Sequence, residues 1–262
     1  MDENYLAYLN RMARLTIPAT YHSQVSHIQD SPKFQPDAGG KRQPVLFPGY
    51  TVITPPGEED PENQSFYEKL TAIQTQLLQQ LEPGLLIPVP TASFHLTLAD
   101  LIWDSAYRHA SQEKPNFEAE LRDTIGEIFQ QSQAAIASSY EIRWQLLGLI
   151  IMPRALGISL LPKDEESYER VVQLRRSLYQ NQRLIGLGIE QQYGFNAHIT
   201  LGYFGDIPPE LDRDRFCSLL TNINQQDLEF PPPELLIKKA ELRKFDDMTR
   251  YYRQPDWPQL EF

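Results

Sequence analysis

The chain has 262 residues and a net charge of −11 at neutral pH, and 41% of its residues are hydrophobic. This composition is that of a globular protein and excludes an intrinsically disordered chain. The negative charge argues against binding to long duplex nucleic acid, which usually requires a basic surface. No apolar run is long enough to cross a membrane, and the single cysteine, Cys217, excludes an intrachain disulfide. We therefore expect a cytoplasmic protein with no membrane partner.

The first 44 residues are expected to form an N-terminal extension. Apolar residues recur with a weak helical period over residues 4–16, which indicates one helix. Residues 18–44 are rich in Pro, Ser, Gln, Asp and Gly, a composition typical of irregular structure. Residues 45–262 are then expected to form a single domain.

Within this domain, a first strand is expected over residues 45–53, followed by an amphipathic helix over 61–81. Extended runs at 85–89 and 94–101 precede a second helix at 116–137, with His109 in a loop between them. Two strands, 141–152 and 155–161, are joined by a tight turn at Pro153-Arg154, and a third helix starts at Asp164. The remaining elements are a strand at 197–204, a short helix at 210–223 and a last strand at 235–245.

This order suggests an internal duplication. In each half of the domain, a strand leads to an amphipathic helix, then to a turn, then to a strand that contains His-x-Thr. The predicted fold class is α+β: two similar lobes related by a pseudo-twofold axis, each a mainly antiparallel sheet backed by helices, around a shared central groove.

The two His-x-Thr segments are Phe94-His95-Leu96-Thr97-Leu98 and Ala197-His198-Ile199-Thr200-Leu201. Because side chains alternate along a strand, the histidine and threonine of each segment share one face, and the apolar residues share the other. Each strand should therefore present an imidazole and a hydroxyl together above a buried apolar back. One such segment is weak evidence for a site, but two in the same apolar frame argue against coincidence.

The residues in this pattern suit phosphodiester cleavage. Histidine has a pKa near 6.5, so one imidazole can act as a base and the other as an acid. The hydroxyls of Thr97 and Thr200 can donate to the non-bridging phosphate oxygens without a metal ion. The sequence contains no phosphate loop, zinc motif or nucleophile elbow. We predict His95, His198, Thr97 and Thr200 as catalytic residues, with no metal and no cofactor.

Paired His-x-Thr strands about 100 residues apart resemble the two-histidine (2H) phosphoesterase superfamily. That superfamily includes RNA 2′,3′-cyclic phosphodiesterases. The stretch Phe47-Pro48-Gly49-Tyr50-Thr51-Val52-Ile53 and the first motif look most like a poorly characterised bacterial branch. The resemblance implies a bilobed fold and metal-independent hydrolysis of a cyclic or terminal phosphodiester. The expected partner is a small cyclic nucleotide or an RNA 3′ end, and the sequence specifies no oligomeric state.

Other side chains on the predicted strands and turns bear on substrate binding. Tyr203 has the parity of the apolar face, so it is expected to point into the lobe and away from the groove. Five others lie on strands or turns that can border the groove: Tyr50, Thr51, Arg154, Lys239 and Arg243.

Two alternative functions stay open at this level. RNA end joining would use the same site in the reverse direction. A non-catalytic protein could bind nucleotides or RNA ends, although such a binder would not need both proton carriers.

Overall fold

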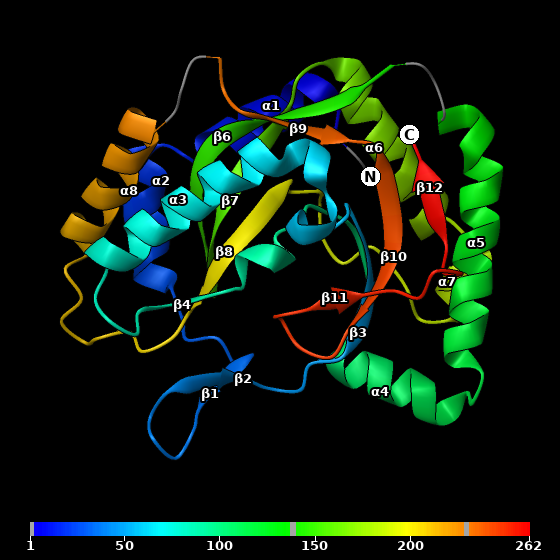
Figure 1. The fold of residues 1–262 in the computed structure, drawn as a ribbon, viewed down its shortest axis with the longest axis horizontal. Helices are drawn as coiled ribbons and strands as arrows, with labels where there is room; N and C mark the ends of the chain where they lie inside the picture. The colour runs from blue at the N-terminus through cyan, green and yellow to red at the C-terminus, as the bar shows by residue number, and fades with distance from the viewer. Residues whose placement is uncertain (1–2, 137–139, 228–230) are drawn as a thin grey trace.

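The computed structural model describes residues 3–136, 140–227 and 231–262, which form two five-stranded antiparallel sheets and a small hairpin (Figure 1). In the first sheet, the strand order is β11 (Tyr251–Tyr252), β10 (Lys239–Phe245), β3 (Gly49–Ile53) and β5 (Thr97–Trp103), and β12 (Gln259–Glu261) pairs with β10. In the second sheet, the order is β4 (Leu86–Pro88), β8 (His198–Phe204), β7 (Ala155–Pro162), β6 (Ile142–Met152) and β9 (Glu234–Ile237). The hairpin consists of β1 (Phe34–Pro36) and β2 (Arg42–Pro44).

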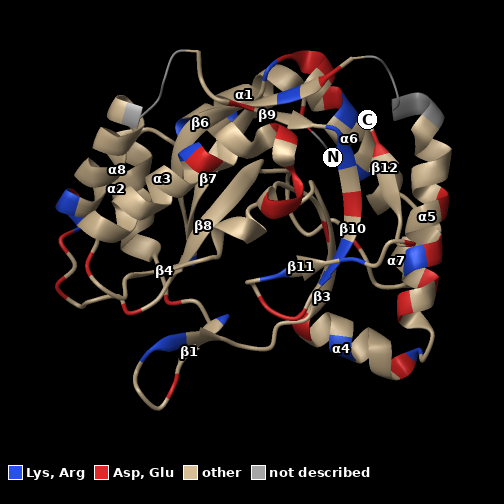
Figure 2. Ribbon diagram, viewed as in Figure 1, with Lys and Arg blue, Asp and Glu red and all other residues tan. Residues whose placement is uncertain are grey.

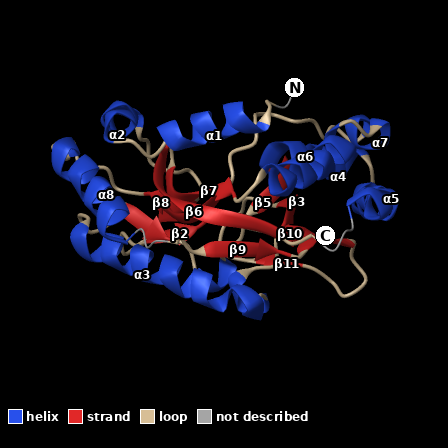
Figure 3. Ribbon diagram, turned by 90° about the horizontal axis from the view of Figure 1, so that it is seen from above, coloured by secondary structure: helices blue, strands red, loops and turns tan. Residues whose placement is uncertain are grey.

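Helices cover the outer faces of both sheets (Figure 3). The second sheet is packed by α1 (Tyr5–Arg14), α2 (Pro18–Gln24), α3 (Gln64–Gln80) and α8 (Arg213–Asp227), and the first by α4 (Asp104–Glu113) and α5 (Phe117–Ile136). Helix α6 (Glu165–Tyr179) contacts strands of both sheets, and the short α7 (Gln182–Gly186) packs on α5 and α6. The predicted α+β class, with two lobes of antiparallel sheet backed by helices, is confirmed.

Amphipathic periodicity explains the longer helices. In α3, the residues Phe66, Leu70, Ile73 and Leu77 form one buried face, as their spacing predicted. Helix α6 begins after Asp164, whose carboxylate accepts a hydrogen bond from the Ser167 backbone N–H. No described helix combines the length and apolar character that crossing a membrane requires.

The lobes do not correspond to consecutive halves of the chain. Strand β4 comes from the first half but pairs with β8 in the second sheet, and β10 comes from the end of the chain but pairs with β3 in the first. The predicted last strand, 235–245, is two strands: β9 joins the second sheet and β10 the first. Each lobe is therefore completed by strands from the opposite half.

Two local predictions were wrong. His109 lies on α4 and is exposed, because residues 104–113 continue directly from β5 into a helix. Residues 18–44 are not irregular, since they contain α2, a 3₁₀ turn at Val25–His27 and the β1–β2 hairpin. The polar composition of this segment hid a few large buried side chains, and these hold its helices against the second sheet.

Those buried side chains place the N-terminal segment in the main core. Tyr8 and Met12 of α1 and Tyr21 of α2 have no exposed surface. The Tyr21 hydroxyl donates a hydrogen bond to the Leu149 carbonyl of β6 at 2.6 Å and accepts one from Asn224 Nδ2 of α8. Helices α1 and α2 thus pack as part of the second lobe.

Candidate active site

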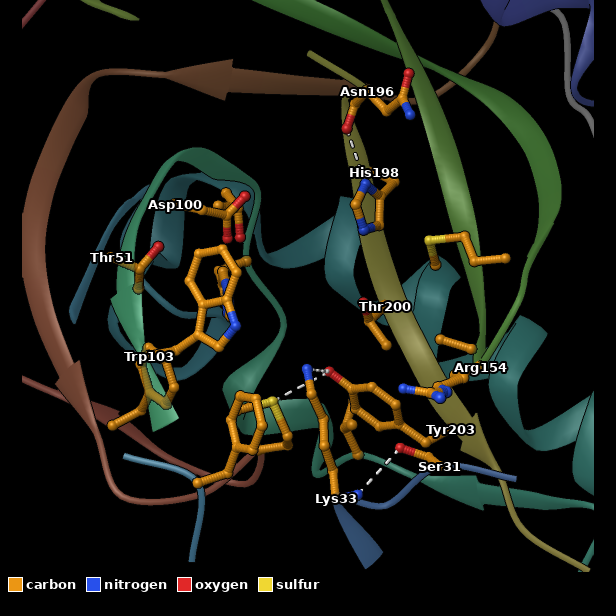
Figure 4. A pocket seen from close by; sticks show the side chains of 18 of the residues that line it. Ser31, Lys33, Thr51, Asp100, Trp103, Arg154, Asn196, His198, Thr200 and Tyr203 are labelled. Atoms are coloured by element: carbon orange, nitrogen blue, oxygen red, sulfur yellow. Dashed lines mark hydrogen bonds between the residues drawn. The ribbon is translucent and has the colours of Figure 1, made fainter. Parts of the chain in front are cut away.

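A pocket of about 780 Å³ lies where the two sheets meet, and both His-x-Thr segments line it (Figure 4). One wall comes from β5 and β3 of the first sheet, and the other from β7 and β8 of the second. The structure brings His95, Thr97, His198 and Thr200 to this one pocket. The expectation that the four side chains share a groove is therefore met.

The backbone on both sides of His95 is fixed by the loop that follows β3. His95 itself lies two residues before β5 begins. Leu96 accepts a hydrogen bond from the Thr54 backbone N–H at 3.0 Å and donates one to the Thr54 hydroxyl at 3.0 Å. The Phe94 carbonyl accepts from the Gly57 N–H at 2.8 Å. These bonds hold the extended conformation that directs the imidazole toward the pocket.

His198 is held in a comparable way at the start of β8. The Ala197 carbonyl accepts a hydrogen bond from Leu160 N–H at 3.0 Å, which continues the pairing of β8 with β7. The Ala197 N–H donates to the hydroxyl of Tyr8 at 3.2 Å. Helix α1 thus supports the second motif directly.

The two imidazoles make the same hydrogen bond. Nδ1 of His95 lies 2.7 Å from the Ser93 carbonyl, and Nδ1 of His198 lies 2.8 Å from the Asn196 carbonyl. A carbonyl oxygen only accepts, so Nδ1 carries the proton in both rings. In a neutral ring this leaves Nε2 with a free lone pair. The repeated contact from residue i to the carbonyl of residue i−2 therefore sets one tautomer at both positions.

Burial distinguishes His95 electrostatically. Desolvation within the pocket lowers the pKa of His95 to about 4, and the nearby His198 and Arg243 add to this decrease. The ring of Tyr251 packs against the imidazole with a centroid distance of 4.2 Å, which contributes to that burial. His95 is thus neutral over the physiological range in the free protein.

The threonines complete the pattern predicted for the motifs. Thr97 and Thr200 are half-buried, and within the described residues neither hydroxyl has a hydrogen-bond partner. The opposite faces of both segments are buried, as alternation predicted; these residues are Phe94, Leu96, Leu98, Ala197, Ile199 and Leu201. Both hydroxyls can therefore donate to a ligand in the pocket.

β-Bulges bring further residues to the pocket that alternation did not predict. The pairing of β8 with β7 skips Leu201, so Tyr203 faces the same side as Thr200 and lines the pocket. The prediction that Tyr203 points into the lobe was wrong for this reason. The pairing of β5 with β3 is irregular in two places, which puts Asp100 and Trp103 on the face of Thr97.

The pocket also contains positive charge. Lys33 from the N-terminal segment, Arg154 from the β6–β7 turn and Arg175 from α6 all line it. Asp100 is the only carboxylate among the described lining residues, and burial raises its pKa. Lys33 was missed because it lies in a segment expected to be irregular.

The remaining predicted binding residues divide into two groups. Tyr50, Thr51 and Arg154 border the pocket, but the Tyr50 hydroxyl donates to Glu118 at 2.8 Å and the Thr51 hydroxyl to the Ala99 carbonyl at 3.2 Å. Arg154 is exposed at the rim and contacts a glutamine side chain at 3.3 Å.

Lys239 and Arg243 do not line the pocket. Basic and acidic residues alternate along β10 (Figure 2), and the basic ones are ion-paired. Lys239 pairs with Glu261 at 3.4 Å, and the buried Arg243 pairs with Glu59 at 2.6 Å. Their prediction as pocket residues failed because the facing of β10 could not be read from its sequence.

No group of histidine, cysteine, aspartate or glutamate side chains suited to a metal ion occurs within residues 3–136, 140–227 and 231–262.

Part of the chain matches a known family model. The family model 2H-phosphodiest, described as a domain of unknown function (DUF1868), matches residues 33–131. The matched stretch includes the first motif, and it supports the superfamily that the paired motifs predicted. Residues 33–131 of the chain are thus similar to the two-histidine phosphoesterases.

Solved structures with a similar fold include a conserved protein of unknown function, ATU0111, from Agrobacterium tumefaciens. It is 17% identical with a TM-score of 0.59, and the alignment covers 89% of this chain and 96% of that one. LigT of Escherichia coli complexed with 3′-AMP (14% identity, TM-score 0.43) and TT0787 of Thermus thermophilus (16%, 0.43) each align over 81% of this chain and 96% of their own. No curated protein matches the sequence significantly.

Proposed function

We propose that the protein hydrolyses a cyclic or terminal phosphodiester, with a nucleoside or RNA-end 2′,3′-cyclic phosphate as the substrate class. The observation that carries this proposal is the matched pair of imidazoles. Each is held through Nδ1 by a backbone carbonyl, and each shares the pocket with a threonine hydroxyl that has no partner among the described residues. This arrangement supplies two proton carriers and two neutral donors around a space that can hold one phosphate.

His95 is assigned as the general base. Its lowered pKa keeps the ring neutral, and its Nε2 lone pair can take a proton from an attacking water. The water oxygen forms a new bond to phosphorus, and the bond from phosphorus to the leaving oxygen breaks. His198, protonated at Nε2, gives its proton to that leaving oxygen. Thr97 and Thr200 donate hydrogen bonds to the non-bridging oxygens, where charge accumulates in the transition state.

Single substitutions of the histidines test this assignment. His95→Gln and His198→Gln should each reduce kcat on a nucleoside 2′,3′-cyclic phosphate by about 10²–10⁴-fold, because each removes one proton transfer. The loss of kcat in the double variant should be much smaller than the product of the two single losses, because the two groups act in one step.

Thr97→Val and Thr200→Val should each reduce kcat by about 10–10³-fold, since each removes one hydrogen-bond donor to the transition state. Turnover should persist in excess EDTA, because the assigned groups need no metal ion.

His109→Gln is the matched control, since His109 is exposed on α4 and lies outside the pocket. It should retain wild-type turnover. Robust turnover in both His95→Gln and His198→Gln would refute the assignment. Tight nucleotide binding without hydrolysis would favour a non-catalytic binder, and joining of RNA ends under the same conditions would favour the ligase.

A further inference from the structure

Two cations at one end of the pocket lack a carboxylate partner. Lys33 and Arg154 both line the pocket, and in the part of the chain that the structure describes neither lies within ion-pair distance of an aspartate or glutamate. The basic residues of β10 are by contrast ion-paired. On a chain with a net charge of −11, two unpaired cations that converge on one pocket indicate a site for an anion.

The Lys33 ammonium is positioned by its surroundings. Nζ lies 3.5 Å from the Tyr203 hydroxyl and 4.8 Å above the ring of Phe47. The backbone of its segment is fixed on both sides of Lys33, since Ser31 N–H donates to the Phe204 carbonyl of β8 at 2.8 Å and Val45 N–H donates to the Lys33 carbonyl at 3.0 Å. The lysine is therefore directed into the pocket by fixed structure.

Lys33 is also only partly solvated. Burial lowers its pKa to about 8; the nearby Arg154 also lowers it, while Asp100 acts in the opposite direction. A cation that has lost part of its hydration gains more from a bound anion than an exposed one does. An anionic ligand would therefore relieve a cost that the free protein bears.

This cationic end is separate from the histidines. His198 and Thr200 lie in the first half of β8, whereas Tyr203, which contacts Lys33, lies near its end (Figure 4). At about 3.3 Å per residue, the step from Thr200 to Tyr203 is roughly 10 Å. Tyr203 pairs with Ala155, the neighbour of Arg154, whereas His198 pairs with Ser159, so Lys33 and Arg154 enter the pocket at the end away from His198. A ligand bound at this end can therefore be a second group, carried by a longer substrate.

We propose that Lys33 and Arg154 form a subsite for a second phosphate group of the substrate. This inference rests on the proposed function and narrows it: the preferred substrate is a cyclic phosphodiester that carries another phosphate about one nucleoside away. The second phosphate can be the 5′-phosphate of a mononucleotide or the internal diester of an RNA 3′ end. Both present oxygen anions to an ammonium and a guanidinium, which are the usual phosphate ligands.

Three substrates distinguish these sources: a nucleoside 2′,3′-cyclic phosphate, the same compound with a 5′-phosphate, and a dinucleotide that ends in the cyclic phosphate. The wild-type kcat/KM should favour a phosphorylated form by about 10–100-fold, mainly through KM, which corresponds to about 1.4–2.7 kcal/mol and is the size expected for a charge-assisted contact. In Lys33→Met and Arg154→Gln, the ratio of kcat/KM for the phosphorylated form to kcat/KM for the unphosphorylated form should fall toward one. Preference for the 5′-phosphorylated nucleoside or for the dinucleotide identifies the source.

Lys41→Met is the matched control, because Lys41 is exposed in the β1–β2 loop and does not line the pocket. It should keep the full preference. Thermal unfolding of each variant checks that the fold is intact, and methionine keeps an unbranched apolar side chain of similar length at this position. If wild type and Lys33→Met discriminate equally, the subsite is refuted, while turnover of the unphosphorylated compound leaves the proposed function standing.

If no cyclic phosphate is hydrolysed, the proposed function fails and the subsite is tested by binding alone. Calorimetry with a nucleoside 5′-monophosphate then compares wild type with Lys33→Met. Tighter binding to wild type supports the subsite independently of catalysis. Equal affinities refute it.

Discussion

His95 and His198 make equivalent backbone contacts, but the protein around His95 disfavours its charged form. Its pKa of about 4 is well below the ordinary histidine value of about 6.5. The cause is mainly burial, with smaller contributions from His198 and Arg243. A base must be neutral to accept a proton, so this environment keeps His95 available in acidic solution.

We therefore expect the acid limb of kcat/KM to lie near pH 4, since the limb follows protonation of His95 in the free enzyme. Above that pH the imidazole is neutral, and below it the base is lost. A pH profile with a nucleoside 2′,3′-cyclic phosphate measures this. An NMR titration of the imidazole signals, with His95 assigned through His95→Gln, checks the same pKa directly. An ordinary midpoint near 6.5 in the NMR titration would contradict the burial argument.

At the scale of elements, the bulges determine which side chains reach the pocket. Strict alternation placed residues 94–98 and 197–201 correctly, because the irregular pairings begin only at Leu98 and Leu201, the last residues of these stretches. It failed beyond them: it assigned Tyr203 to the wrong face and did not predict that Asp100 and Trp103 line the pocket. A bulge reflects pairing with a neighbouring strand, so the sequence of one strand does not reveal it. Because of the bulges in β5, its pocket-lining residues Thr97, Asp100 and Trp103 lie three positions apart in the sequence instead of two.

Gly202 is required where β8 passes β4 next to the bulge. A Cβ at this position would lie 2.7 Å from the Ile87 carbonyl oxygen and 2.9 Å from the Leu86 side chain. We expect Gly202→Ala to lower the free energy of unfolding by about 1–3 kcal/mol, because both strands must shift. Urea denaturation measures this. Gly186→Ala is the control, since a Cβ there meets no atom within 4 Å. A wild-type midpoint for Gly202→Ala would show that the strands adjust without cost.

The sequence also did not predict that strands are exchanged between the lobes. Helix and strand periodicities predicted the bounds of most elements to within a few residues, because one face of each element is buried. Which sheet a strand joins depends on contacts far along the chain, as for β4 with β8 and β10 with β3. The same limit applies to Lys33, whose role depends on where its segment packs.

At the scale of the whole molecule, acidic residues outnumber basic ones, but they do not do so in the lining of the pocket. Acidic residues give the protein its net charge of −11, whereas the described lining of the pocket has one carboxylate, Asp100. The cations Lys33 and Arg154 lie with the two histidines in the same pocket. An acidic exterior disfavours non-specific binding to long nucleic acid, while a local cationic pocket still admits a small phosphate compound. The overall charge and the proposed substrate are therefore compatible.

The N-terminal segment belongs to this organisation, and we propose that it folds with the rest of the domain. Tyr8, Met12, Tyr21 and Val25 are at most 2% exposed. Burial of one large apolar side chain contributes roughly 1.5–3 kcal/mol, so these four contribute about 6–12 kcal/mol. That sum is comparable to the whole stability of a typical domain, about 5–15 kcal/mol. Tyr8 also supports the backbone next to His198.

A chain shortened to residues 29–262 should therefore lose its cooperative unfolding transition, because it would expose the surface that α1 and α2 cover. Circular dichroism during urea denaturation tests this, with the point variants Tyr8→Ala and Leu6→Ala as a matched pair on α1. Tyr8 is fully buried and its loss should cost about 3–5 kcal/mol, whereas Leu6 is 68% exposed and its loss should cost little. If the shortened chain instead unfolds cooperatively at the wild-type midpoint, the segment is a separate extension and its contacts do not hold the second lobe together.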